Sequence, residues 1–153
     1  MYANTCAQNI GFSALYNMQA EGFGVGARWE LRSEKDWQFV PQFSYFLPFN
    51  KVHEWTVGIA VQRVLFRQGK WSGYALGHLG YNKWMNPEAS AMKNAQSNNW
   101  NGELGAGMKW GKRIKPFIEW RYNIRFQEAH WQLGLLFSVK GGGPKKEKCA
   151  AYN

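Results

Sequence analysis

The stretch FGVGARWELR, from Phe23 to Arg32, alternates strictly between apolar residues and small or charged ones. One set of alternate positions is apolar and consists of Phe23, Val25, Ala27, Trp29 and Leu31. The other set is small or charged and consists of Gly24, Gly26, Arg28, Glu30 and Arg32. Because successive side chains of a β-strand point to opposite faces, this segment predicts a strand with one apolar and one polar face.

Seven further segments repeat this alternation, and turn-forming or charged residues separate them. Each has about the 9 to 11 residues, or slightly more, of a tilted membrane-spanning strand. The eight predicted strands are Asn9–Gln19, Phe23–Arg32, Trp37–Phe49, Glu54–Phe66, Trp71–Trp84, Trp100–Trp110, Ile114–Phe126 and His130–Lys140. The orientation of Trp71–Trp84 stays open, although one assignment places Leu79 outside and Tyr74, Leu76 and His78 inside.

The bulk composition restricts the class of protein. The 153 residues suffice for one domain, and aromatic residues make up 17% of them. The mean hydropathy is nevertheless only −0.51, so apolar and polar residues must be interleaved. No apolar run approaches the roughly 20 residues of a membrane-spanning helix, which excludes a helical membrane protein. The net charge of +9 would also suit an anionic partner.

The alternation has two interpretations, a water-soluble barrel or sandwich with an apolar core and a barrel with its apolar face turned to lipid. The apolar faces carry bulky aromatics near strand ends, as membrane barrels do at the two interfaces. Eight such faces could not all fit into the narrow interior of a small barrel. We therefore predict an all-β, eight-stranded, antiparallel, up-and-down transmembrane β-barrel.

In this pattern the chain resembles the small outer-membrane barrels of the OmpA-like and OmpX-like type from Gram-negative bacteria, including the Bacteroidota. The resemblance covers Asn9 to Lys140. In the last strand, Trp131, Leu133, Leu135 and Phe137 resemble the terminal signal that the barrel-assembly machinery reads, although the chain continues past Phe137. The resemblance implies a bacterial outer-membrane location, with membrane lipid and the barrel-assembly machinery as partners.

The lengths of the connections indicate an orientation. Short charged turns at Ser33–Asp36, Arg67–Lys70 and Gly111–Arg113 are expected on the periplasmic side, together with both termini. The longest connection, Met85–Asn99, is then an outer loop. Residues 1–8 read as an N-terminal segment with a possible signal-peptide remnant, 9–140 as the barrel and 141–153 as a basic periplasmic tail.

The polar faces of the predicted strands carry charges of both signs. Buried charges persist only when they are paired and hydrogen-bonded, so we expect a salt-bridge network that plugs the lumen. A selective pore lined by the same groups is the alternative. The expected members are Arg28, Glu30, Arg32, Glu103, Lys109, Glu119, Arg121 and Arg125.

The sequence contains weak catalytic signals. His130 with Glu128, or with Ser13 or Ser44, would suit a lipid-modifying membrane enzyme, but no spacing of nucleophile and base is diagnostic. No Cys or His spacing predicts a metal, and GFGVGA at Gly22–Ala27 lies within a strand rather than opening a helix. A nucleic-acid partner is not expected, because the arginines and aromatics lie on opposite faces. We therefore expect no enzyme activity and no cofactor.

The two ends of the chain carry the remaining signals. Cys6 and Cys149 are the only cysteines, and a disulfide between them in the oxidising periplasm is one reading. Two free thiols, or loss of Cys6 by signal cleavage, are the others. The tail lysines Lys145, Lys146 and Lys148 are expected to bind an acidic periplasmic partner or lipid headgroups. These features predict a structural or accessory subunit of an envelope assembly; the competing classes are a membrane enzyme and a soluble ligand-binding barrel.

Overall fold

In a computed structural model, the described part of the protein is all-β. The structure describes residues 8–19, 21–32, 36–47, 53–85 and 96–139, and for Arg32 only the backbone. No helix in these ranges is long and apolar enough to cross a membrane. The strands are β1 (Gln8–Asn17), β2 (Gly22–Arg32), β3 (Trp37–Phe46), β4 (His53–Gln68), β5 (Trp71–Met85), β6 (Asn98–Trp110), β7 (Ile114–Asn123) and β8 (Glu128–Val139).

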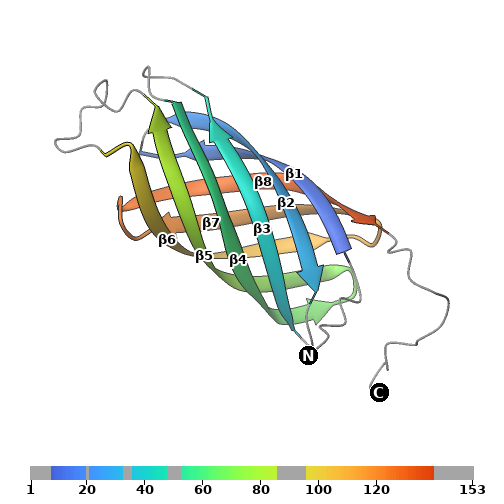
Figure 1. The fold of residues 1–153 in the computed structure, drawn as a ribbon. Helices are drawn as coiled ribbons and strands as arrows, with labels where there is room; N and C mark the ends of the chain where they lie inside the picture. The colour runs from blue at the N-terminus through green and yellow to red at the C-terminus, as the bar shows by residue number, and fades with distance from the viewer. Residues whose placement is uncertain (1–7, 20, 33–35, 48–52, 86–95, 140–153) are drawn as a thin grey trace, which may run out of the picture.

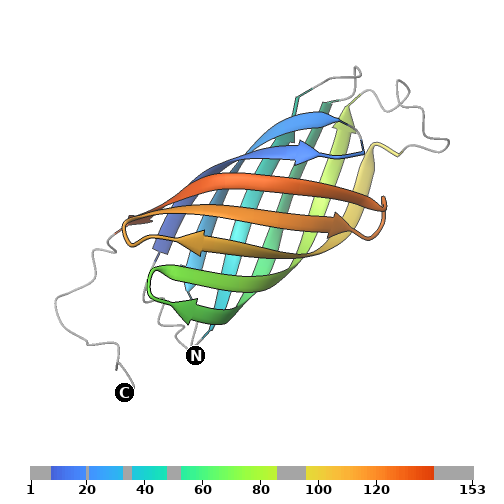
Figure 2. The ribbon, with the colours of Figure 1, turned by 180° about the vertical axis from the view of Figure 1, so that it is seen from behind.

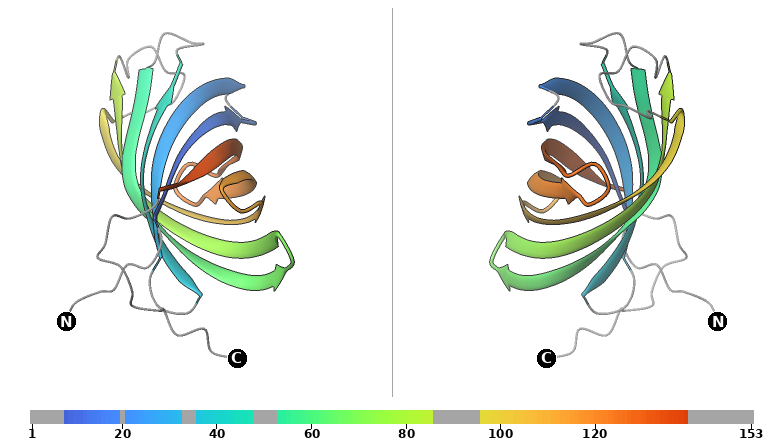
Figure 3. Two further views of the ribbon diagram at one scale, coloured as in Figure 1. Left: turned by 90° about the vertical axis from the view of Figure 1, so that its right-hand side faces the viewer. Right: turned by 90° about the vertical axis from the view of Figure 1, so that its left-hand side faces the viewer.

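The eight strands form one closed antiparallel barrel in which each strand pairs with its neighbours in sequence (Figures 1 and 2). The sheet closes because β1 pairs with β8 along its whole length, from Gln8 opposite Val139 to Asn17 opposite His130. Figure 3 shows the strands curving round a common interior. This is the predicted up-and-down topology, and its closure leaves no unpaired sheet edge.

The strand ends differ from the predicted ones by a few residues. For example, β7 ends at Asn123 rather than Phe126. The side-chain oxygen of Asn123 accepts hydrogen bonds from the backbone N–H groups of Arg125 and Phe126, at 3.1 and 3.2 Å, and so begins a turn. An asparagine that bonds to its own following backbone competes with continuation of the strand.

A β-bulge in β4 was not predicted. The pairing of β4 with β5 shifts between Val64 and Phe66, so that Val64 lies opposite Tyr74 while Phe66 lies opposite Gly73. The extra residue, Leu65, and its neighbour Phe66 are both exposed. A bulge adds one residue to one strand and changes which face the following side chains occupy. The inward–outward alternation of β4 therefore changes phase near its end.

The polarity of the barrel is inverted relative to a water-soluble protein. Among the described residues, 18 buried residues are polar or charged and nine are hydrophobic, while Trp, Phe, Leu and Ile dominate the outer wall. Soluble monomers bury most of their large apolar side chains and expose only small apolar patches. The soluble-barrel alternative is therefore wrong, and the fold is that of a transmembrane β-barrel.

The orientation of β5 is resolved by its burial pattern. Tyr74, Leu76 and His78 are buried inside the barrel, whereas Leu79 is exposed on the outer wall. The alternation therefore holds in this strand too, with an aromatic and an aliphatic residue filling the interior beside the histidine. The assignment that placed Leu79 outside is confirmed.

Aromatic clusters mark both ends of the outer wall on β4, β5 and β6. Trp71 and Trp110 stack with ring centroids 5.3 Å apart beside the short turns, and Tyr81 packs between Trp55 and Trp100 near the other end. Trp71 and Tyr81 are ten residues apart on β5. At about 3.3 Å per residue and a tilt of about 40°, that separation spans about 25 Å, the height of the apolar band of membrane barrels.

Candidate functional site

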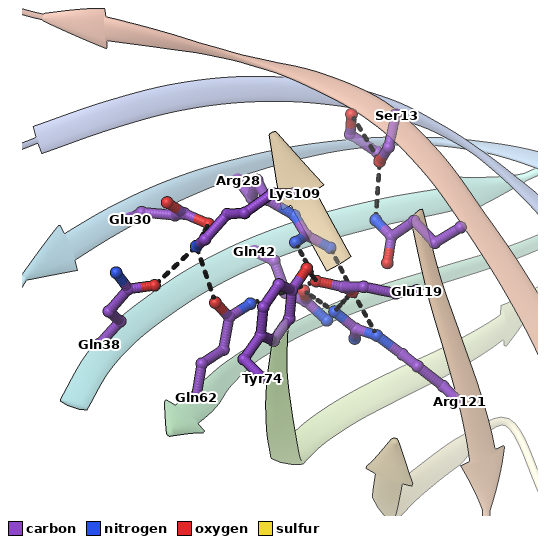
Figure 4. A network of polar contacts seen from close by, with 12 residues as sticks. Ser13, Arg28, Glu30, Gln38, Gln42, Gln62, Tyr74, Lys109, Glu119 and Arg121 are labelled. Carbon is purple, nitrogen blue, oxygen red and sulfur yellow. Dashed lines mark hydrogen bonds and ion pairs between the residues drawn. The ribbon is translucent and has the colours of Figure 1, made fainter. Parts of the chain in front are cut away.

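The centre of the barrel interior is organised around the carboxylate of Glu119 on β7 (Figure 4). Arg28 donates to it with both terminal nitrogens, at 2.5 and 2.8 Å. Arg121 donates to it through Nε at 2.9 Å and through Nη2 at 2.6 Å. The Tyr74 hydroxyl and the Gln62 amide complete the set at 2.7 and 3.2 Å. Both carboxylate oxygens are therefore saturated with donors.

The bidentate pairing of Arg28 with Glu119 joins two strands that are not neighbours in the sheet. Arg28 lies on β2 and Glu119 on β7, and their sequence positions differ by 91 residues. Neither side chain is accessible to solvent. The guanidinium carbon of Arg28 also lies 4.2 Å from the centroid of the Phe117 ring. Two parallel charge-assisted hydrogen bonds add geometric specificity to the attraction, so this pair fixes the position of β2 relative to β7 across the interior.

A second layer of the network surrounds Lys109 towards the end that carries the short turns. The Lys109 ammonium donates to Glu30 at 2.9 Å, to the amide oxygen of Gln38 at 2.7 Å and to that of Gln62 at 3.4 Å. The other carboxylate oxygen of Glu30 accepts a bond from the Asn9 amide at 3.0 Å. Gln62 bonds to both Lys109 and Glu119, so it connects this layer to the centre.

A third layer surrounds Glu103 towards the opposite end. Its Oε2 atom lies 2.9 Å from Nδ1 of His78, 3.4 Å from Nη1 of Arg121 and 4.0 Å from Nε2 of His130. A hollow of about 30 Å³ borders this layer. That is the volume of about one water molecule.

The fully buried charges balance. Three cations, Arg28, Lys109 and Arg121, face three carboxylates, Glu30, Glu103 and Glu119, and each of the six is at most 7% exposed. Burial of an ion is costly unless an opposite charge and hydrogen bonds compensate it, so this equality is what allows the charges to stay inside. The arrangement fills the middle of the lumen with paired side chains.

Close packing by glycine allows the central layer to form. Gly107 on β6 lies beside both Tyr74 and Glu119, and a Cβ atom at this position would come within 2.7 Å of each side chain. The absence of a side chain there lets the Tyr74 hydroxyl reach the carboxylate. Glycine on the inner face of a strand marks such a close approach.

The structure brings together six of the eight residues that the sequence indicated for the lumen. These are Arg28, Glu30, Glu103, Lys109, Glu119 and Arg121. The side chain of Arg32 lies outside the described part of the chain.

The prediction for Arg125 is wrong. β7 ends before it, the strand alternation stops in the turn, and its side chain is exposed, donating to the carbonyl oxygen of Trp100 at 2.9 Å. The neutral members of the network were missed, namely Asn9, Gln38, Gln42, Gln62 and Tyr74, although their strand parity was visible in the sequence.

The catalytic alternative gains no geometric support within the described residues. The Ser13 hydroxyl accepts a bond from the Gln132 amide at 2.7 Å and lies 3.5 Å from the carbonyl oxygen of Gly26. No described hydrogen bond joins Ser13 or Ser44 to His130, whose Nε2 atom lies 4.0 Å from Oε2 of Glu103. The Glu128 carboxylate instead accepts a bond from the Asn17 amide at 2.8 Å. No group of His, Cys, Asp and Glu in the described residues could hold a metal ion.

The remaining sequence predictions divide between the last strand and the chain ends. Trp131, Leu133, Leu135 and Phe137 all project outward from β8, each at least 40% exposed. This outward orientation does not test their predicted role as an assembly signal. The remaining predicted residues fall outside the described ranges and are Cys6, Lys145, Lys146, Lys148 and Cys149.

The sequence matches no family model and no curated protein. Solved structures with the same fold exist. The N-terminal β-barrel domain of Pseudomonas aeruginosa OprF superposes with a TM-score of 0.66 at 14% identity, covering 90% of this chain and 100% of that domain. A de novo designed transmembrane β-barrel superposes with a TM-score of 0.62 at 11% identity, covering 91% of this chain and 100% of the design.

One of the similar structures is an enzyme. The outer membrane enzyme PagL superposes with a TM-score of 0.57 at 10% identity, covering 86% of this chain and 99% of PagL. Because such low identities establish the fold alone, activity has to be argued from this chain's own residues. The chain thus has the fold of the small eight-stranded transmembrane β-barrels, a group that includes the Yersinia pestis outer membrane protein Ail and the outer membrane enzyme PagL.

Proposed function

We propose that this protein is a non-enzymatic barrel of a Gram-negative outer membrane, of the Bacteroidota type, with a structural or accessory role. The observation that carries the proposal is the saturated, charge-balanced network around Glu119, which fills the middle of the lumen. An eight-stranded barrel has an interior just wide enough for side chains to fill. A filled interior leaves the outer wall, the loops and the tail as the parts that act on other molecules.

The proposal predicts that the purified barrel does not conduct ions. Refolded protein inserted into a planar lipid bilayer is expected to give no stable current steps, because Arg28, Glu119 and Arg121 close the passage with bonds between 2.5 and 2.9 Å. Insertion is checked in vesicles by gel electrophoresis with and without boiling, since a folded closed barrel migrates anomalously. Reproducible unit currents from inserted protein would instead support the selective pore.

The proposed setting is the outer membrane with both termini in the periplasm. The short turns at one end and the longer connections at the other support this orientation. Outer-membrane lipid would surround the apolar wall, and the barrel-assembly machinery would recognise Trp131, Leu133, Leu135 and Phe137 on β8. Other outer-membrane or periplasmic protein subunits are further proposed partners.

The accessory role is assigned to the basic tail. Lys145, Lys146 and Lys148 follow a glycine-rich segment, and their charges suit an acidic periplasmic partner. Deletion of Gly141–Asn153 is expected to abolish co-purification of that partner from detergent extracts, with the intact chain as the reference. A control in which the three lysines alone become glutamine separates charge from length. Equal recovery with the intact and truncated chains would refute the tail assignment.

A further inference from the structure

The two rims of the barrel differ in charge. Among the described residues, the rim with the short turns carries one carboxylate, Asp36, and six cationic side chains, which are Arg63, Arg67, Lys70, Lys112, Arg113 and Lys115. The opposite rim carries three described carboxylates, Glu21, Glu54 and Glu128, against Lys83 and Arg125. The positive charge of the described part is therefore concentrated at one membrane surface.

A hollow of about 190 Å³ opens within the basic rim, between the β4–β5 turn and the β6–β7 turn. Four cationic side chains line it, Arg67, Lys70, Lys109 and Lys115, and none of the described residues lining it is acidic. The two turns are tied together by a hydrogen bond of 3.1 Å from the Gly111 N–H to the Lys70 carbonyl oxygen. A backbone hydrogen bond thus holds together the two turns that border the hollow.

Two of the four cations that line the hollow pair with carboxylates of the described residues. Asp36 pairs with Arg67 at 2.5 Å, and Glu30 pairs with Lys109 at 2.9 Å. Each of these carboxylates accounts for one lining cation. The ammonium group of Lys70 has no acceptor within the described residues and is exposed beside the hollow.

The depth of the hollow in the membrane is indicated by Trp71 and Trp110, which form part of its wall. Their rings stack on the outer surface, and the two side chains are 48% and 45% exposed. Tryptophan concentrates at the membrane–water interface, where its ring contacts apolar chains and its N–H meets polar groups. The hollow therefore lies at the level of lipid headgroups, at the mouth of the barrel, where the inward-facing Lys109 and the outward-facing Trp71 and Trp110 both line it.

We propose that this hollow binds the phosphate group of an anionic glycerophospholipid whose acyl chains lie along the outer wall below the Trp71–Trp110 pair. The volume equals that of about six water molecules, which accommodates a phosphodiester. The lysines supply point charges for the phosphate, and the tryptophans support the glycerol region. The inference rests on the membrane placement in the proposed function, but not on the closed lumen or the tail.

The test compares two double variants of the full-length protein that remove the same charge from opposite rims. K70Q/K115Q changes the hollow, and K83Q/R125Q changes the other rim; each lowers the net charge from +9 by two, to +7. Native mass spectrometry from zwitterionic micelles measures binding of phosphatidylglycerol and phosphatidylcholine at equal concentration. K70Q alone serves as a milder variant, because Lys115 also donates to Asn9 at 3.2 Å.

We expect the wild type to prefer phosphatidylglycerol. K70Q should weaken that binding about fivefold, the effect of one lysine near a membrane surface, and K70Q/K115Q should weaken it further. K83Q/R125Q should bind as the wild type does. Equal loss in both double variants, or no lipid preference in the wild type, would overturn the proposal. So would displacement by inorganic phosphate at the concentration of the lipid, since the site would then bind free anions.

A separate readout distinguishes failure of this inference from failure of the membrane placement. All variants are first inserted into phosphatidylcholine vesicles and examined for the folded band on unboiled gels. A protein that inserts and folds but shows no headgroup preference contradicts the lipid site alone. A wild type that fails to insert contradicts the proposed function itself, and with it this site.

Discussion

Replacing Glu119 by glutamine is expected to lower the free energy of unfolding by about 3–5 kcal/mol, the cost of breaking a buried ion pair from one side. The substitution retains the shape of the side chain but removes the charge that Arg28 and Arg121 share. Both guanidinium groups then remain buried with a deficit of negative charge. Equilibrium unfolding in phospholipid vesicles, followed by tryptophan fluorescence, measures the change.

Two further variants separate the buried network from general charge effects. Glu21→Gln removes an exposed carboxylate in a turn and is expected to change stability by at most about 0.5 kcal/mol. Arg28→Met combined with Glu119→Gln removes one buried cation with the buried anion, so the pair should cost less than the sum of the two single changes. A Glu119→Gln protein as stable as the wild type would show that the negative charge of Glu119 is not needed to compensate the buried arginines.

Replacing Leu104 by arginine is expected to destabilise the barrel by about 2–4 kcal/mol, as a basic side chain does at the bilayer midplane. Leu104 lies midway along β6 and is 58% exposed on the outer wall. In a water-soluble protein an exposed leucine can become arginine at almost no cost. In lipid the guanidinium must leave water, so the same substitution reports directly on what surrounds the wall. The measurement is again equilibrium unfolding in phospholipid vesicles.

Ile114 provides the matched control for depth. It is 55% exposed and begins β7 beside a short turn, at the edge of the apolar band. Ile114→Arg is expected to cost about 0–1 kcal/mol, because an arginine near the interface reaches water and headgroups. Equal effects at Leu104 and Ile114 would argue against a depth-dependent lipid environment and hence against the membrane-spanning orientation.

The residue order by itself determined the strands and the direction in which their faces point. In β2, Trp29 and Arg28 alternate as the sequence predicts, and the same rule places Glu119 and Arg121 inside and Trp120 outside on β7. The reason is local: consecutive side chains of an extended chain must point to opposite sides. Polarity then decides which side meets lipid, because eight aromatic faces cannot share a narrow lumen.

Local breaks in that rule were decided only by the tertiary structure. The bulge at Leu65 reverses the phase of β4, and the turn begun by Asn123 sends Arg125 outward. Both depend on how neighbouring strands pair, since a bulge exists only relative to a partner strand. The neutral members of the lumen network, such as Gln62, likewise became recognisable only once they were seen to bridge two charged layers.

The sequence alone also did not predict which charged residues pair across the lumen. Alternation places Arg28 and Glu119 inside, but 91 residues separate them, and nothing in either strand specifies that they lie at the same height. Strand tilt and stagger around the closed sheet set that height. The sequence thus determined which charges enter the barrel, whereas closure of β1 onto β8 determined which of them meet, because only the closed ring places β2 and β7 across the β1–β8 seam with just these two strands between them.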